Sequence, residues 1–150
     1  MKIGVIGLGL IGGSFALSAK KSIRDCSLFG MDNNPEHLSQ AFELGIINQS
    51  LTPLNYSRMD VIILAIPVNA VLEIILTLLD QINDNALLID VGSTKEMICE
   101  KVKLHSKRSQ FLATHPIAGT EFSGPSAANK NLFKGNCLLY TSDAADDSLR

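Results

Sequence analysis

Three glycines are spaced near the start of the chain as a dinucleotide-binding site requires. The motif G-x-G-x-x-G covers residues 7–12, after a short apolar run and before an amphipathic stretch. In such a motif Gly7 would permit the tight turn, Gly9 would let a pyrophosphate approach the backbone, and Gly12 would let a helix pack closely on a strand. The N-terminus of that helix would offer free N–H groups to the phosphates.

Asp32 supplies the acidic residue that normally follows this motif by about 20 positions. Its carboxylate would accept hydrogen bonds from the ribose hydroxyls of adenosine and would repel a 2′-phosphate. Asn33 and Asn34 come next, with no arginine, so the sequence favours NAD over NADP. The alternative is a glycine-rich turn with a solvated aspartate. The residues expected to bind the cofactor are Gly7, Gly9, Leu10, Ile11, Gly12, Asp32, Pro67 and Ser93.

Two further segments carry side chains suited to hydride transfer. Ser93 lies in the segment Asp90–Lys95, where its hydroxyl could hold a substrate or, equally, cap a helix. His115 follows an apolar run, and Glu121 stands six residues further on. A neutral imidazole can accept a proton from an alcohol as hydride leaves, so His115 is the candidate base. The other two histidines lie in predicted helices among polar neighbours, and we expect them at the surface.

These side chains need a common scaffold to meet. Short β-branched runs alternate with longer helical stretches, which is typical of βαβ units and predicts an α/β fold with a Rossmann-type, doubly wound, mainly parallel sheet. Ligands of such sheets bind beyond the carboxyl ends of the strands, where the segments above lie. The expected strands are Lys2–Ile6, Ser27–Met31, Ile46–Asn48, Asp60–Ile66, Ala86–Val91, Gln110–Thr114 and Asn136–Tyr140. The expected helices are Leu10–Lys21, one from Pro35 to before Gly45 with Asn33 or Asn34 as its N-cap, Val68–Leu79 and Thr94–Ser106.

Composition and charge exclude several classes of protein. Of 150 residues, 46% are hydrophobic, which excludes a disordered chain, and the net charge of −2 gives no attraction to nucleic acid. Three cysteines without a C-x-x-C pair argue against a disulfide framework and against a metal site. We expect a cytoplasmic protein without a membrane partner, because no signal peptide precedes the first strand pattern and no apolar run reaches membrane-spanning length.

Three segments together resemble the prephenate dehydrogenase family, which includes arogenate and cyclohexadienyl dehydrogenases. They are residues 7–14, residues 90–95 and the segment His115–Pro125, whose HPIAGTE block is the most discriminating. The resemblance runs from Met1 to about Gly135. It implies NAD-dependent oxidative decarboxylation of prephenate to 4-hydroxyphenylpyruvate, a step of tyrosine biosynthesis.

The same resemblance implies roles for individual residues. His115 would hydrogen-bond the ring hydroxyl and take its proton, Ser93 would help to hold that hydroxyl and the nicotinamide end, and Glu121 would belong to the polar network of the pocket. Lys95 could offset the negative charge of the substrate, but we expect a solvated lysine on a helix. Ser93 is therefore counted with both the catalytic and the cofactor-binding residues.

The resemblance also predicts how the chain is divided. We expect residues 1–140 to form the dinucleotide-binding domain and residues 141–150 to be an atypical tail, either foreign to the protein or a divergent C-terminus. A helical domain, through which the full-length enzyme would form a homodimer, would be absent. Three functions stay open: a prephenate dehydrogenase, an arogenate dehydrogenase, and an NAD-binding module without activity of its own.

Overall fold

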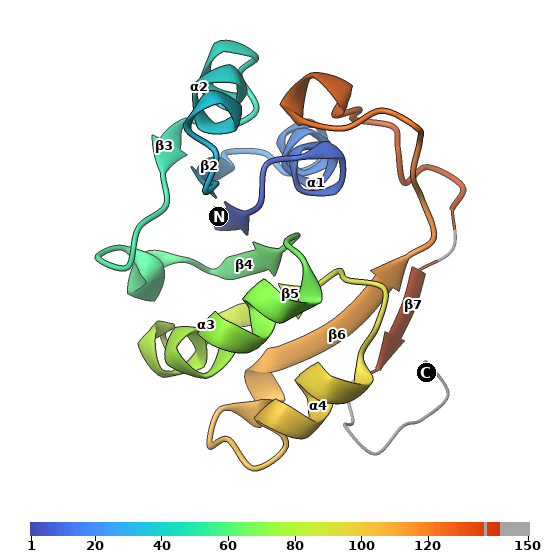
Figure 1. The fold of residues 1–150 in the computed structure, drawn as a ribbon. Helices are drawn as coiled ribbons and strands as arrows, with labels where there is room; N and C mark the ends of the chain where they lie inside the picture. The colour runs from blue at the N-terminus through green and yellow to red at the C-terminus, as the bar shows by residue number, and fades with distance from the viewer. Residues whose placement is uncertain (137, 142–150) are drawn as a thin grey trace.

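A seven-stranded sheet lies between two layers of helices in the computed structural model, which describes residues 1–136 and 138–141 (Figure 1). The strand order is β3-β2-β1-β4-β5-β6-β7; β7 runs antiparallel to β6, and the other neighbours are parallel. This arrangement confirms the predicted Rossmann-type, mainly parallel sheet. The strands are β1 (Lys2–Ile6), β2 (Ser27–Met31), β3 (Gln49–Ser50), β4 (Val61–Leu64), β5 (Leu87–Asp90), β6 (Phe111–Pro116) and β7 (Leu138–Thr141).

The helices cover both faces of the sheet, as continuous apolar strands require. One buried cluster joins the sheet to α1 and α2, and a second joins it to α3 and α4. The helices are α1 (Leu10–Ser22), α2 (Pro35–Glu43), α3 (Val68–Gln81) and α4 (Glu96–Val102), with 3₁₀ turns η1 (Tyr56–Arg58), η2 (Arg108–Gln110) and η3 (Pro125–Ala127). The chain order reverses between β1 and β4, and a sheet of this kind binds ligands at such a point.

The segment that includes η3 and continues to residue 136 crosses over α1 before the chain enters β7 (Figure 1). The N–H of Asn129 donates to Oγ of Ser14, at 2.8 Å, and Ser14 is fully buried. The rings of Phe15 and Phe133 lie 4.3 Å apart between centroids. These two contacts hold residues 125–136, which we call the strap, against α1.

Several predicted boundaries differ from those of the structure. The third strand is Gln49–Ser50 rather than Ile46–Asn48, because Ile46 and Ile47 are buried in the core. Asn48 then holds the chain beside β2: its N–H donates to Leu28 O at 2.8 Å, and its Oδ1 accepts from Leu28 N. The helix predicted over Thr94–Ser106 is shorter in the structure, where α4 covers only Glu96–Val102. Asn34 is the N-cap of α2, with its Oδ1 accepting from Glu36 N at 2.9 Å.

In the part of the chain that the structure describes, no helix is both long and apolar enough to cross a membrane. No group of three His, Cys, Asp or Glu side chains in that part could hold a metal ion. Cys26 and Cys99 are free thiols. Cys137 lies outside the described residues, as does the predicted tail apart from the backbone of Thr141 at the end of β7.

Candidate active site and cofactor crevice

The glycine motif forms the turn between β1 and α1. Gly7 has a φ of +93°, which other residues rarely adopt, and a Cβ there would collide with the carbonyl of Ala65 after β4. A Cβ on Gly12 would collide with the carbonyl oxygen of Gly7. A Cβ on Gly9 would instead meet nothing within 4 Å. Two of these glycines therefore allow close packing, and the third lies beside open space that a phosphate could enter.

The first turn of α1 leaves its backbone N–H groups available. Its N-cap is Gly9, which has no side chain to accept from them, and its first turn contains no acidic residue. The N–H of Gly13 is the first to reach a helical acceptor, the Gly9 carbonyl at 2.9 Å. The N–H groups of Leu10, Ile11 and Gly12 precede that bond. Together they form a site for an anion at a positive helix end.

The carboxylate of Asp32 is held at the end of β2, beside the glycine turn. Its Oδ2 accepts from Leu8 N at 2.7 Å and its Oδ1 accepts from Asn34 N at 2.9 Å. The side chain is only 8% exposed, and Nδ1 of His37 lies 3.6 Å from Oδ1. Two backbone donors thus fix the carboxylate, and its oxygens retain capacity for further hydrogen bonds, such as those from ribose hydroxyls.

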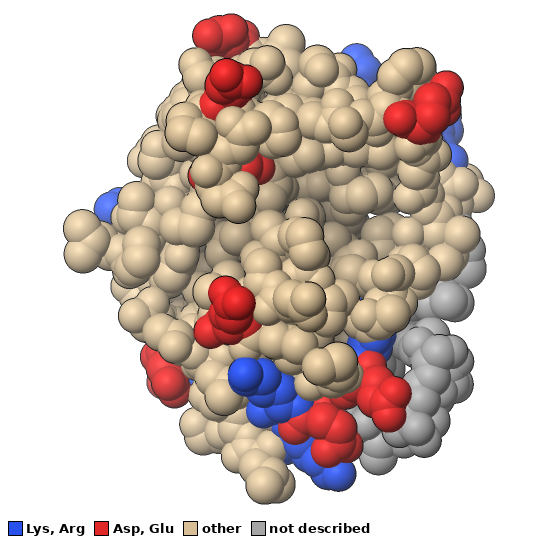
Figure 2. Space-filling model, in the orientation of Figure 1, with Lys and Arg blue, Asp and Glu red and all other residues tan. Residues whose placement is uncertain are grey.

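A cavity of about 570 Å³ lies between the glycine turn, the end of β2 and the start of α3. We call it the first cavity. Four predicted cofactor residues line it: Gly7, Gly9, Asp32 and Pro67. The centre of the face seen in Figure 2 is hollowed and its walls are mostly uncharged, whereas basic and acidic side chains lie together along the lower edge.

Three polar residues that line the first cavity were not among the predicted cofactor residues: Asn33, His37 and Glu73. His37, expected at the surface, is half-buried against Asp32 and lines the cavity together with Glu73 of α3. A signal for His37 was its place in the first turn of the helix that follows Asp32. Met31 and Ile74 add apolar surface to the same wall.

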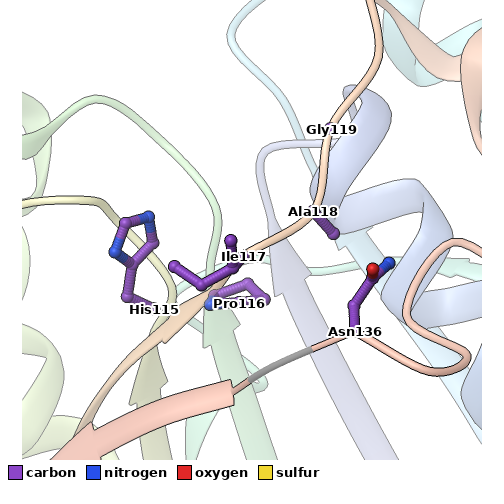
Figure 3. Close-up of a pocket in the computed structure, with 6 residues that line it drawn as sticks. All are labelled: His115, Pro116, Ile117, Ala118, Gly119 and Asn136. Atoms are coloured by element: carbon purple, nitrogen blue, oxygen red, sulfur yellow. The ribbon is translucent and has the colours of Figure 1, made fainter.

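A second cavity, of about 460 Å³, opens at the carboxyl end of β6. It is lined by residues 115–119 and Asn136, and Figure 3 shows the imidazole of His115 and the amide of Asn136 on either side of Pro116 and Ile117. His115 lies within β6 rather than after it, because β6 extends to Pro116 and pairs there with β7. The imidazole has no hydrogen-bond partner among the described residues.

Ser93 and Glu121 lie outside the lining of the second cavity. Ser93 is exposed in the loop after β5. Because β5 and β6 are parallel neighbours, this loop and His115 lie at the same edge of the sheet. Neither Ser93 nor Thr94 caps α4, whose N-cap is Lys95. Glu121 is exposed in the segment after β6 and makes no hydrogen bond or ion pair within the described part of the chain. The catalytic roles of both residues stay predictions.

A buried ion pair lies beneath the loop of Ser93. Nζ of Lys95 donates to Oδ2 of Asp90, and these side chains are 3% and 0% exposed. Burial raises the pKa of Asp90 and lowers the pKa of Lys95, and in each case the opposite charge of the partner counters the shift. The expectation of a solvated Lys95 is therefore wrong, and the ammonium is equally not free to meet a substrate.

Comparison with known proteins gives consistent matches. A family model described as prephenate dehydrogenase, nucleotide-binding domain, matches residues 15–150. The prephenate dehydrogenase of Lactococcus lactis is 34% identical over 150 residues, which cover 97% of this chain and 42% of that protein.

Solved structures show the same relationship. The chain resembles the prephenate dehydrogenase from A. aeolicus in complex with hydroxyphenyl propionate and NAD⁺, with 32% identity and a TM-score of 0.84 over 94% of this chain and 50% of that one. Synechocystis arogenate dehydrogenase matches with 30% identity and a TM-score of 0.81, over 99% and 53% of the two chains. The chain spans about half the length of these relatives.

Proposed function

Since the chain belongs to the prephenate dehydrogenase family, as its nucleotide-binding domain, we propose that it binds NAD⁺ and supplies the hydride-transfer side of a site that oxidises prephenate. The observation that carries the proposal is the position of the two cavities. Both open at the carboxyl ends of strands in one sheet, one beside the glycine turn and one beside His115.

The first cavity has the features that the adenosine half of NAD⁺ needs. Asp32 is placed to accept hydrogen bonds from the ribose hydroxyls and would repel the 2′-phosphate of NADP. The N–H groups of Leu10 and Ile11 would receive the pyrophosphate, which the open space at Gly9 admits. Apolar lining such as Ile74 suits the face of adenine.

The side chains of the second cavity would act on the substrate. Bound NAD⁺ supplies the hydride acceptor. The imidazole of His115, for which no hydrogen bond is found among the described side chains, would take the proton of the ring hydroxyl. Ser93, from the loop after the neighbouring strand β5, would hold that hydroxyl, and Glu121, from the segment after β6, would complete the polar network, although neither lines the second cavity in this structure. Loss of carbon dioxide from the opposite ring carbon leaves the product aromatic.

An NAD-binding module without activity of its own is the second candidate, and the charge of the cavities favours it. Prephenate carries two carboxylates, yet no Lys or Arg of the described part of the chain lines either cavity. Lys95 is occupied by Asp90. Full activity would then need cations from elsewhere, and these could also discriminate arogenate from prephenate.

Titration of the 150-residue chain with NAD⁺ and NADP⁺ in a calorimeter tests the proposal. We expect saturable binding of NAD⁺ and weaker binding of NADP⁺. Absence of NAD⁺ binding by the folded chain would overturn the proposal. An assay of NADH formation with prephenate and with arogenate then separates the candidates, because turnover excludes the inactive module.

A further inference from the structure

Asp90, at the end of β5, forms hydrogen bonds to three other residues near the candidate site. Its Oδ2 receives Nζ of Lys95, and its Oδ1 receives the N–H of Gly92 at 3.3 Å. Its backbone carbonyl receives Oγ1 of Thr114 at 2.8 Å and Nζ of Lys95 at 3.4 Å. One fully buried residue is thereby bonded to the loop after β5 and to the neighbouring strand β6.

The pair between Asp90 and Lys95 closes the loop that contains Ser93. Four residues, 91–94, lie between the two partners. Ser93 and Thr94 are exposed, whereas Lys95 is almost completely buried. No side-chain cap holds the start of α4. The carboxylate of Asp90, which holds Gly92 on one oxygen and Lys95 on the other, therefore bridges the two ends of the loop.

The same residue fixes the strand that carries His115. Thr114, which donates to Asp90, immediately precedes His115, and Asp90 stands opposite Ala113 in the sheet. Burial raises the pKa of Asp90; the charge of Lys95 and, among the smaller causes, that of His115 act in the other direction.

A buried ion pair is a weak source of stability, because the cost of removing both charges from water offsets their attraction. When every polar group has a partner, however, such a pair restricts the local structure to one geometry. We propose that Asp90 and Lys95 form a positioning pair, which holds the loop of Ser93 in register with His115 at the nicotinamide end of the site. This inference rests on the proposed function. Lys95 is then a positioning residue and makes no contact with the substrate.

The test compares two ligands, since ADP has the adenosine and pyrophosphate of NAD⁺ but lacks the nicotinamide end. In Lys95→Met we expect affinity for NAD⁺ to fall about five- to tenfold, the value of one hydrogen bond, while affinity for ADP changes less than about twofold. Calorimetric titration of wild type and variant measures both constants. A loss confined to NAD⁺ would not follow from general destabilisation, which affects both ligands.

Lys103→Met is the matched control, because Lys103 forms an exposed ion pair with Glu100, 3.4 Å away, at the other end of α4. It should leave both affinities unchanged. Lys95→Arg keeps the charge and should restore part of the preference for NAD⁺ over ADP. Should Lys95→Met fail to fold by circular dichroism, Asp90→Asn, which keeps the size of the side chain, should show the same selective loss.

Several outcomes would overturn the inference. A folded variant that binds NAD⁺ as wild type does, or that loses NAD⁺ and ADP equally, contradicts a positioning role. A wild-type chain that binds neither ligand overturns the proposed function, and the inference with it. The two failures are distinguishable, because only the second appears in the wild-type titration.

Discussion

The first and second cavities are built in different ways, although they open at the same edge of one sheet. The first cavity combines a contiguous β-α-β segment, which supplies the glycine turn, the free N–H groups of α1 and the fixed carboxylate of Asp32, with the start of α3. The second is lined by His115, the four residues after it and Asn136, and among these only His115 is titratable. One cavity therefore has groups for every part of its proposed ligand, and the other has one candidate base and no cation.

This difference indicates how the work of a two-sided enzyme can be divided. Backbone N–H groups and one acid suffice to recognise a dinucleotide, so a single domain can hold it. Recognition of a small dianion requires cations, and the lining of the second cavity contains no Lys or Arg. Each prediction below alters one of the two cavities, or the buried ion pair of Asp90 and Lys95, and states which measured property should change.

Replacing His115 should have the largest effect, and only on the second cavity. In a full-length family member, Asn at the matching histidine should lower kcat by about 10²- to 10⁴-fold, because the proton acceptor is lost. His115→Asn in this chain should leave NAD⁺ affinity unchanged. Steady-state kinetics and calorimetry measure the two quantities, and unchanged kcat would remove His115 from the mechanism.

Removing the cation of the buried pair should cost the most stability. Lys95→Met leaves the carboxylate of Asp90 buried without its partner, so the free energy of unfolding should fall by about 3–5 kcal/mol. The double variant Asp90→Asn/Lys95→Met should recover part of this loss, since no unpaired charge remains. Urea denaturation checks both, with Lys103→Met as the surface control. Equal losses in the single and double variants would contradict the assigned cause.

Two glycine variants should separate ligand binding from packing in the first cavity. Gly9→Val places its side chain in open space, so it should lower NAD⁺ affinity about tenfold or more with little loss of stability. Gly12→Ala should instead destabilise the fold by about 1–3 kcal/mol, because its Cβ meets the backbone of Gly7. Calorimetry measures the NAD⁺ affinity of each variant, and urea denaturation measures its free energy of unfolding. A large loss of stability in Gly9→Val, with unchanged NAD⁺ affinity, would contradict the assigned role of Gly9.

The smallest predicted effect concerns the choice between the two dinucleotides. Asp32→Ser removes the charge that repels a 2′-phosphate, so the affinity ratio of NADP⁺ to NAD⁺ should rise by about three- to tenfold. His37, which lines the same cavity beside Asp32, serves as the control. His37→Gln leaves the carboxylate of Asp32 in place, so it should change the affinity ratio of NADP⁺ to NAD⁺ less than Asp32→Ser does. A ratio that does not move in Asp32→Ser would count against the role of Asp32.

The local parts of the fold were predictable, because their signals lie close together in the sequence. The glycine turn, β1, α1 and β2 follow from one motif and one acid, and the family resemblance is confirmed by the family model over residues 15–150 and by the similar proteins. The run Ile46–Ile47 misled, since apolar residues packed under helices look like a strand when periodicity is the only guide.

The parts that depend on distant packing were not predictable. A lysine near a helix start is normally solvated, and nothing in the sequence shows that Lys95 is buried against Asp90 at the end of β5. The same holds for His37, whose burial depends on how α2 meets the first cavity. Ser93 and Glu121 remain predictions from the resemblance, because no contact in the described structure assigns their roles.

The strap over α1 has a consequence for the order in which the chain folds. The bond from Asn129 to Ser14 joins residues 115 positions apart, so it forms only after nearly the whole domain has left the ribosome. Contacts of such separation slow folding, because a long loop must close before they contribute. During synthesis, the face of α1 that the strap covers would stay open to solvent, and amide hydrogen exchange on stalled nascent chains should find it protected last.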